Sequence, residues 1–427
     1  MKLRKFLAGA ACASVMLSLA ACSSTETTGS GSPVADASTG TVRMWVMEGS
    51  LSAESQTFLT EEFAAANPGS ELKIEVQQWD GIVSKLQTSL ASKNESPDLV
   101  EIGNTQTATF TTVGAFADIT DLKAQLGGED LIPSFVDAAT VDGKTYAYPL
   151  YAGARGVYYR TDLFENAGIA VPQTIEQFHD AAVDLQTANP DAAADFSGMY
   201  LAAVDPHGVE SYLFAQGFEY ATQKGGEWVG QASAPQSLEA LTSLQDLFQN
   251  GTKYALDSQA GQKSFERYFN DGSTGMLIGT GNIGTKIDQA LWDEGKVGVL
   301  AIPSTEPGVP GATFAGGSNI ALATNSQNPE LAKKALDVIF AEGFQKLLAE
   351  EGWVPGNTAY AADVAGPFGQ IAGEIITNSK LTPNSAEWGV AFGSTQLNEF
   401  FTRIAKGEDV EAVAKAFDDQ LNAALNK

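Results

Sequence analysis

The sequence predicts an α/β protein, with a parallel-type sheet that carries helices on its faces. Its 427 residues are enough for two or three lobes, each with a core of its own. An apolar fraction of 44% is typical of a globular protein and argues against a polytopic membrane protein and against general disorder. After residue 40 the chain alternates between strand and helix patterns, which indicates parallel strands joined by crossover helices.

The first five elements follow from hydrophobic periodicity. Alternating apolar residues predict strands, and apolar residues three or four apart predict helices. The order is a strand at 41–47, a helix at 53–66, a strand at 72–76, a helix from Ile82 through Leu90, and a strand at 98–102. In a parallel sheet ligands collect at the carboxyl ends of the strands, so the residues after each strand are candidates for binding.

Helical patterns continue through the rest of the chain, at 161–167, 174–186 and 237–250. Asn328 is a suitable N-cap for a further helix that begins at Pro329. The last segment is amphipathic, with apolar residues at steps of three or four: Val410, Val413, Phe417, Leu421 and Leu425. The α/β pattern therefore extends to the C-terminus.

The net charge and the cysteine content exclude several classes of partner and of chemical site. The net charge is −27, and because Lys2, Arg4 and Lys5 precede Cys22, the rest holds 22 bases against 52 acids, or −30. This acidity repels phosphate backbones and anionic lipid, so we expect no nucleic-acid partner, and membrane contact requires a separate anchor. The only cysteines are Cys12 and Cys22, and the two histidines are far apart. We therefore predict no disulfide, no thiol nucleophile, no metal site and no cofactor in the body.

The N-terminus predicts a lipoprotein signal. A basic start and an uncharged run at 6–20 are typical of a signal peptide, which we place at 1–21. The sequence Leu19-Ala20-Ala21-Cys22 matches the bacterial lipobox, which predicts lipidation of Cys22; the alternative is an ordinary secretory signal with an accidental cysteine. Residues 22–40 are rich in Ser, Thr, Gly and Pro and predict a flexible tether. Attached acyl chains would hold the protein at a membrane surface.

Several segments resemble one family, in order along the chain. Residues 142–167 (DGKTYAYPLYAGARGVYYRTDLFENA) are similar to the GKxYxxPxxxxxxxxYYxxDLFxxAG block of extracellular solute-binding proteins for oligosaccharides. These are the receptors of ABC importers, and the group includes the maltodextrin-binding protein. Segment 101–116 and the YAGAR at 151–155 look closest to actinobacterial receptors, some of which take chitobiose-like or plant-derived sugars. Further similar blocks lie at 171–182, 265–278, 314–322 (FAGGSNIAL), 329–356 (ending in GWVPG) and 406–418.

The resemblance implies a two-lobed periplasmic-binding-protein-like fold, with a ligand cleft between the lobes that closes about a hinge. It places residues 41–150 and 302–343 in the N-terminal lobe, and 151–301 and 344–427 in the C-terminal lobe. It implies a monomeric receptor that captures a di- to tetrasaccharide without catalysis and passes it to ABC permease subunits. With a lipid on Cys22, we expect it on the extracellular face of the cytoplasmic membrane of a Gram-positive bacterium.

Aromatic candidates follow from the chemistry of a sugar, whose ring has apolar faces and a rim of hydroxyls. Trp45 ends the first strand, where the family places a sugar contact, and Trp79 follows the second strand. Trp353 and Trp388 lie in late segments that the family folds back over the cleft. Each of these four indoles is a candidate platform for a sugar ring, with packing in the core or the hinge as the alternative.

Polar candidates follow the strands or the predicted hinge. Asn104 and Thr105 could instead cap a helix, and Arg155 could instead pair with an acid at the hinge. The Gly316-Gly317-Ser318 run could be a tight turn, and His207 could be a solvated loop residue. The polar candidates are Glu48, Asn104, Thr105, Gln106, Tyr151, Arg155, His207, Asn282, Gly317 and Ser318.

Gly279-Thr280-Gly281-Asn282-Ile283-Gly284 matches the G-x-G-x-x-G pattern of dinucleotide sites. Such a site also needs an acid about 20 residues later at the end of a second strand, and Asp293 and Glu294 do not meet this requirement. In the resembled family this loop often carries a tryptophan, and Asn282 takes a nearby place. We therefore interpret the loop as a candidate for hydrogen bonding to sugar.

Two rival functions remain. One is the same fold with an anionic ligand such as a glycerol phosphate, held by Arg155. The other is a secreted glycoside hydrolase, which needs two carboxyls about 5–10 Å apart, a pair that 52 acids cannot exclude. No G-x-S-x-G, H-E-x-x-H or body cysteine is found, so serine, zinc and thiol hydrolysis have no visible residues. No catalytic residue is predicted.

Overall fold

The computed structural model describes residues 39–79, 81–192, 194–258, 265–392 and 394–427. The expected signal peptide, Cys22 and most of the expected tether lie outside the described residues, so they stay predictions. Among the helices of the described ranges, none is both long and apolar enough to cross a bilayer.

The first part of the chain forms the predicted parallel βαβαβ unit. β1 runs parallel to β2 and to β3, and Trp45 lies opposite Glu75 on one side and Val100 on the other. Each predicted strand and helix of this unit is present within one or two residues. The unit consists of β1 (Thr41–Met47), α1 (Ala53–Ala66), β2 (Glu71–Gln77), α2 (Ile82–Ala91) and β3 (Leu99–Gly103). It is followed by α3 (Thr107–Thr111), α4 (Lys123–Leu126), α5 (Pro133–Ala138), β4 (Thr140–Val141) and β5 (Lys144–Thr145).

Helix starts agree with the predictions in position but not always in mechanism. The Ser52 hydroxyl caps α1 by accepting a hydrogen bond from the Ser55 N–H at 3.0 Å. α13 (Pro329–Ile339) begins at Pro329 as expected, but the Asn328 side chain does not cap it. Its Nδ2 donates instead to the Thr41 carbonyl at 3.0 Å, which ties α13 to the start of β1.

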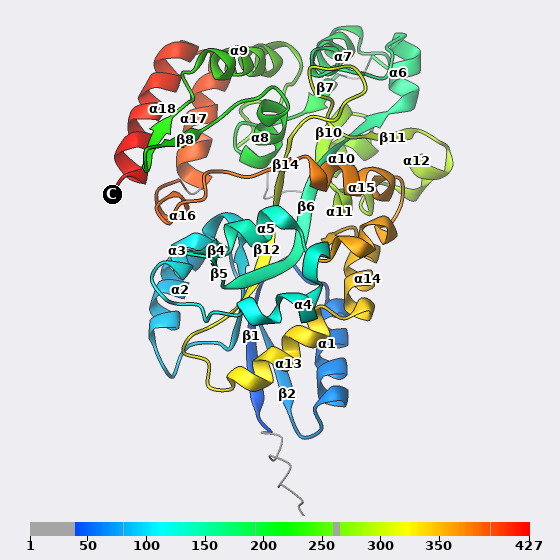
Figure 1. Cartoon of the computed structure of the whole chain (residues 1–427). Coiled ribbons are helices and arrows are strands. Elements are labelled where there is room, and N and C mark those ends of the chain that lie inside the picture. The colour runs from blue at the N-terminus through cyan, green and yellow to red at the C-terminus, as the bar shows by residue number, and fades with distance from the viewer. Residues whose placement is uncertain (1–38, 80, 193, 259–264, 393) are drawn as a thin grey trace, which may run out of the picture. The chain divides into compact units, whose positions relative to one another are not determined.

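Two long strands connect the two lobes (Figure 1). The main sheet has the order β2-β1-β3-β12-β6-β10-β7, so β6 (Ala147–Arg160) and β12 (Thr313–Leu322) lie at its centre. β12 is antiparallel to β3 and to β6, and β6 is antiparallel to β10 (Thr274–Thr280), which is parallel to β7 (Ser197–Tyr200). This is a two-lobed α/β fold, as predicted.

On one side of β12 and β6 the sheet contains β3, β1 and β2, and on the other side it contains β10 and β7, while β11 pairs with β6. The short strands β13 and β14 pair with β6 and β12. The remaining elements are α6 (Thr161–Ala167), α7 (Ile175–Ala188), α8 (Pro206–Phe214), β8 (Ala221–Lys224), β9 (Glu227–Gly230), α9 (Pro235–Asn250), α10 (Glu266–Asn270), α11 (Gly281–Gly284), α12 (Gln289–Asp293), β11 (Val297–Leu300), α13 (Pro329–Ile339), α14 (Glu342–Glu350), β13 (Val354–Pro355), α15 (Phe368–Thr377), β14 (Ser379–Lys380), α16 (Trp388–Ala391), α17 (Ser394–Ala405) and α18 (Val410–Leu425).

Buried apolar residues form several clusters along the sheet. Phe63 belongs to the same cluster as Phe344, and Ile302 belongs to another cluster with Phe417. A third cluster combines residues from both ends of the sheet. The expected lobe boundaries, at 150, 302 and 343, stay predictions.

Candidate functional site

The crossing strands bring several predicted residues together. Alternate residues of a strand share a face, so Tyr151, Gly153 and Arg155 lie along one face of β6. A Cβ on Gly153 would lie 3.3 Å from Trp353 Cζ3 and 3.1 Å from Thr280 Cγ2, so the missing side chain gives these two neighbours room. Late and early segments of the chain therefore meet at this point of β6.

Trp353 and Asn282 present partly accessible groups beside this point. The Trp353 indole is half-buried and packs on the Tyr151 ring, with centroids 4.4 Å apart and planes 38° apart. Asn282 is half-buried at the start of α11, and its side chain accepts a hydrogen bond from the Thr280 hydroxyl. An indole face and an amide group are the kinds of side chain that bind a sugar ring and its hydroxyls.

Arg155 and His207 form a second group, because both side chains lie beside the Phe314 ring. The His207 imidazole lies parallel to the Phe314 ring at 4.2 Å, and its side chain is 44% exposed. The Arg155 guanidinium carbon lies 5.7 Å from the same ring. Its Nη1 donates to the Gly153 carbonyl at 3.3 Å, and burial lowers the pKa of Arg155. The guanidinium thus keeps donors for a further partner.

His207 is held in place by a buried carboxylate. Its Nδ1 lies 2.8 Å from Glu210 Oε2, and Glu210 is fully buried. The other oxygen of Glu210 accepts a hydrogen bond from the Tyr220 hydroxyl at 2.9 Å. His207 is therefore an oriented side chain, not a freely solvated loop residue.

The N-terminal lobe contributes a third group after β1, β2 and β3. Trp79 is 41% exposed, and a Cβ on Gly103 would lie 3.7 Å from its Cζ3 and 3.6 Å from Gln106 Oε1. Gln106 Oε1 is buried and has no hydrogen-bond partner among the residues that the structure describes. Glu48 is exposed, and Thr105 is half-buried. These side chains remain candidates for ligand contacts.

Trp45 is a core residue in the structure, which disagrees with its expected role as a sugar platform. It is 4% exposed and packs with Ile82 and Leu86 beneath α2. Its Nε1 donates to Glu75 Oε2 at 2.8 Å, and Lys85 Nζ lies 5.0 Å from the ring centroid. β1 continues for two residues beyond Trp45. The indole therefore lies between the sheet and α2, and not at the end of the strand.

Trp388 and Asn104 also serve the fold. Trp388 is 2% exposed and packs on Phe392 and Tyr220, with centroids 4.9 and 5.0 Å away. Asn104 is 2% exposed; its Nδ2 donates to the Ala315 carbonyl at 3.0 Å, and its Oδ1 accepts from the Thr105 N–H at 2.9 Å. These contacts leave neither side chain free for a ligand in this conformation.

A buried carboxylate that the sequence analysis did not single out lies under the site. Glu101 is fully buried in the middle of β3. Its Oε1 accepts hydrogen bonds from the hydroxyls of Ser50 (2.6 Å), Ser318 (2.6 Å) and Tyr151 (2.9 Å), and its Oε2 accepts from the Met47 N–H (2.7 Å). Burial raises the pKa of Glu101. Ser318 and Tyr151, both predicted as ligand contacts, are thus engaged with Glu101.

The G-x-G-x-x-G pattern has a packing explanation. It covers the end of β10 and the single turn of α11. A Cβ on Gly281 would lie 2.2 Å from the Gly352 carbonyl oxygen, and one on Gly284 would lie 3.0 Å from the Tyr158 hydroxyl. Close approach of neighbouring groups therefore accounts for these glycines.

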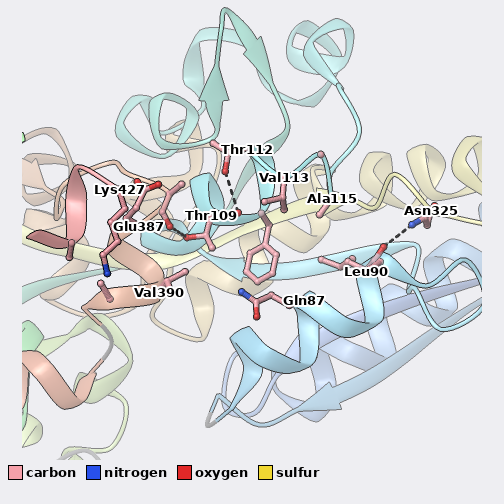
Figure 2. Close-up of a pocket in the computed structure, with 16 residues that line it drawn as sticks. Gln87, Leu90, Thr109, Thr112, Val113, Ala115, Asn325, Glu387, Val390 and Lys427 are labelled. Atoms are coloured by element: carbon pink, nitrogen blue, oxygen red, sulfur yellow. Dashed lines mark hydrogen bonds between the residues drawn. The ribbon is translucent and has the colours of Figure 1, made fainter. Parts of the chain in front are cut away.

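Figure 2 shows a pocket of about 580 Å³. Its walls come from α2, from α3 and the loop after it, from α16 and from the end of α18. Thr109 Oγ1 donates to the Ala386 carbonyl at 2.7 Å beside it. None of its lining residues is a predicted site residue. Across the described ranges, no three His, Cys, Asp or Glu side chains cluster in a way that could hold a metal ion.

Known proteins resemble the chain along its length. A family model for bacterial extracellular solute-binding proteins matches residues 48–346. The diacetylchitobiose binding protein DasA of Streptomyces coelicolor is 30% identical over 428 residues, which cover 99% of each chain.

Solved structures share the fold at lower identity. The GacH receptor of Streptomyces glaucescens, solved unliganded and with acarbose, has a TM-score of 0.77 at 20% identity and covers 91% of this chain and 98% of its own. The sugar-binding protein MalE of Xanthomonas citri has a TM-score of 0.77 at 20% identity and covers 90% and 97%. At this identity the two structures support the fold alone.

Proposed function

The chain belongs to the bacterial extracellular solute-binding proteins, and on this premise we propose that it captures an oligosaccharide between its lobes for import by an ABC transporter. The sugar would be a di- to tetrasaccharide, in line with the diacetylchitobiose named for the relative from Streptomyces coelicolor. Closure of the lobes about β6 and β12 would trap it. The bound sugar would then pass to the permease subunits without any bond being made or broken.

One observation carries this proposal at the level of residues. Partly accessible Arg155, His207 and Trp353 gather where β6 passes from one lobe to the other. The indole offers an apolar face, and the guanidinium and imidazole offer donors for hydroxyl groups. Trp79, Gln106 and Glu48 of the N-terminal lobe would then complete the site as the lobes close.

Calorimetric titration of the purified body with diacetylchitobiose, lactose and maltotriose tests the proposal. We expect micromolar or tighter binding of at least one neutral sugar, that is about −8 kcal/mol or better. The Arg155 guanidinium also favours an anion as second candidate, so sn-glycerol 3-phosphate is titrated in parallel. Binding of the phosphate alone would establish that alternative and reject the oligosaccharide.

Absence of catalysis is part of the same proposal. The matched family is described as bacterial extracellular solute-binding proteins, and the relative from Streptomyces coelicolor is described as a diacetylchitobiose binding protein. Prolonged incubation with the bound sugar, followed by chromatography of the products, separates a receptor from a glycoside hydrolase. A receptor returns the sugar intact, whereas cleavage would replace the transport proposal with an enzymatic one.

We further propose that Cys22 carries a lipid that holds a monomeric receptor on the extracellular face of the cytoplasmic membrane of a Gram-positive cell. The lipobox at 19–22 supports this anchor. Expression of the full chain and of the Cys22→Ala variant, followed by fractionation, tests it. The wild type should remain with membranes, and the variant should appear in the medium; equal release of both would reject the anchor.

A further inference from the structure

One oxygen of Glu101 connects three separate segments of the chain. The three hydroxyls on Oε1 come from the loop after β1, from β6 and from β12, through Ser50, Tyr151 and Ser318. β6 and β12 are the two strands that run between the lobes. A single buried carboxylate therefore fixes both crossing strands to the N-terminal lobe.

The two attached residues lie at the same level of the sheet. Tyr151 of β6 pairs directly with Ser318 of β12, and the pairing is irregular on the N-terminal-lobe side of this rung. The next rungs toward the C-terminal lobe contain glycine in β12, with Ala152 opposite Gly317 and Gly153 opposite Gly316. Glycine without a side chain to pack is the weakest residue in a strand and the easiest to bend.

The backbone at Gly317 supports this location for bending. Its φ is +155°, and a Cβ there would lie 2.4 Å from the Tyr151 carbonyl oxygen. Only glycine fits this rung, next to the one that Glu101 fixes. Rigid attachment on one side and glycine on the other localise a change of backbone angle to the rungs between them.

We propose that Glu101 is a positioning residue of the ligand site, which fixes Tyr151 and Ser318 and so confines the bending between the lobes to the rungs at Gly153, Gly316 and Gly317. The same contacts hold the Tyr151 ring against Trp353. The effect on sugar binding rests on the function proposed above, whereas the effect on the strands does not.

Glu101→Gln tests the charge with little change in shape. The amide has one acceptor oxygen and no charge, so it cannot hold three converging hydroxyls and the Met47 N–H as the carboxylate does. Tyr151→Phe and Ser318→Ala each remove one hydroxyl from a crossing strand and leave the carboxylate in place. Ser50→Ala is not a control, because Ser50 Oγ also accepts a hydrogen bond from the Tyr151 hydroxyl at 2.7 Å. Ser326→Ala is the matched control, because it removes a hydroxyl that donates to a different carboxylate, Asp98 Oδ1, outside the crossing strands.

Hydrogen exchange of the full-length protein without sugar, followed by mass spectrometry of peptides from β6 and β12, is the first readout. We expect at least tenfold faster exchange in both strands for Glu101→Gln, Tyr151→Phe and Ser318→Ala, and no change there for Ser326→Ala. Equal exchange in the wild type and all variants would overturn the proposal. If Glu101→Gln does not fold, Tyr151→Phe and Ser318→Ala decide the result alone.

Calorimetric titration with diacetylchitobiose is the second readout. We expect an at least tenfold higher Kd for the variants that release the crossing strands, measured at a temperature at which each variant is folded. Faster exchange with an unchanged Kd would overturn the role in positioning. If the wild type binds none of the neutral sugars, the proposed function fails while the exchange result still decides whether Glu101 fixes the strands.

Discussion

Trp45→Ala should destabilise the protein and leave the sugar affinity of the folded molecules nearly unchanged. The indole is 4% exposed, and burial of an aromatic side chain removes about 150–250 Å² from water, or about 4–6 kcal/mol at 25 cal/mol per Å². Alanine retains part of this burial, so truncation should cost about 3–5 kcal/mol of the free energy of unfolding. Glu75 keeps Arg43 at 3.0 Å and Lys73 at 2.8 Å, so loss of the indole N–H adds little. Urea unfolding followed by fluorescence measures this loss.

Trp79→Ala is the matched comparison, because Trp79 is 41% exposed. It should change the free energy of unfolding by less than about 1 kcal/mol and raise the Kd for sugar. The reasoning is refuted if the free energy of unfolding of Trp45→Ala lies within 1 kcal/mol of the wild-type value while the variant binds no sugar. That result would restore Trp45 to the ligand site and imply that the sheet layer opens there.

Three further predictions concern other parts of the molecule. His207→Gln keeps a donor for its buried carboxylate partner but loses the ring on Phe314, so calorimetry should show at least tenfold weaker sugar binding, about 1.4 kcal/mol, and little change in melting temperature. Gly281→Ala should lower the free energy of unfolding by about 1–3 kcal/mol because its Cβ would lie 2.2 Å from a backbone oxygen, whereas Gly373→Ala, with open space in α15, should be neutral or slightly stabilising in the same urea assay. A hydrogen bond from Arg43 is the main cause that lowers the pKa of Glu75 to about 2. The ionised form of Glu75 therefore stabilises the fold above about pH 4.5, and this stabilisation is lost as the pH falls toward 2. The free energy of unfolding of Glu75→Gln should fall less over that pH range than that of the wild type.

Periodicity predicted the elements of the first βαβαβ unit, but it did not predict which face of each strand is covered. The pattern predicted β1 at the observed residues, yet it could not tell that the residues on the Trp45 face are covered by α2. Coverage depends on how α2 packs on the sheet, which is a tertiary property. Among the residues that follow strands, Glu48 and Trp79 are exposed whereas Asn104 is buried, so position after a strand does not by itself predict exposure. The burial of Trp388 was not predicted for the same reason, because its contact with the Tyr220 ring forms only when the chain folds.

Glu101 illustrates the other limit of a single sequence. A carboxylate within the apolar strand DLVEIG is itself a signal, because an isolated buried charge is costly and must be compensated by partners. The partners, however, are hydroxyls of Ser50, Tyr151 and Ser318, which lie 51, 50 and 217 residues away in sequence. Hydroxyl residues are too common for such pairs to be chosen from spacing. Two of the three were predicted as ligand contacts: Tyr151 because it follows the predicted hinge, and Ser318 because the glycines before it could let the backbone approach a sugar closely. Both lie where β6 and β12 cross between the lobes. The structure engages them with a carboxylate at that same place, so a residue can govern the site through its support without reaching the ligand.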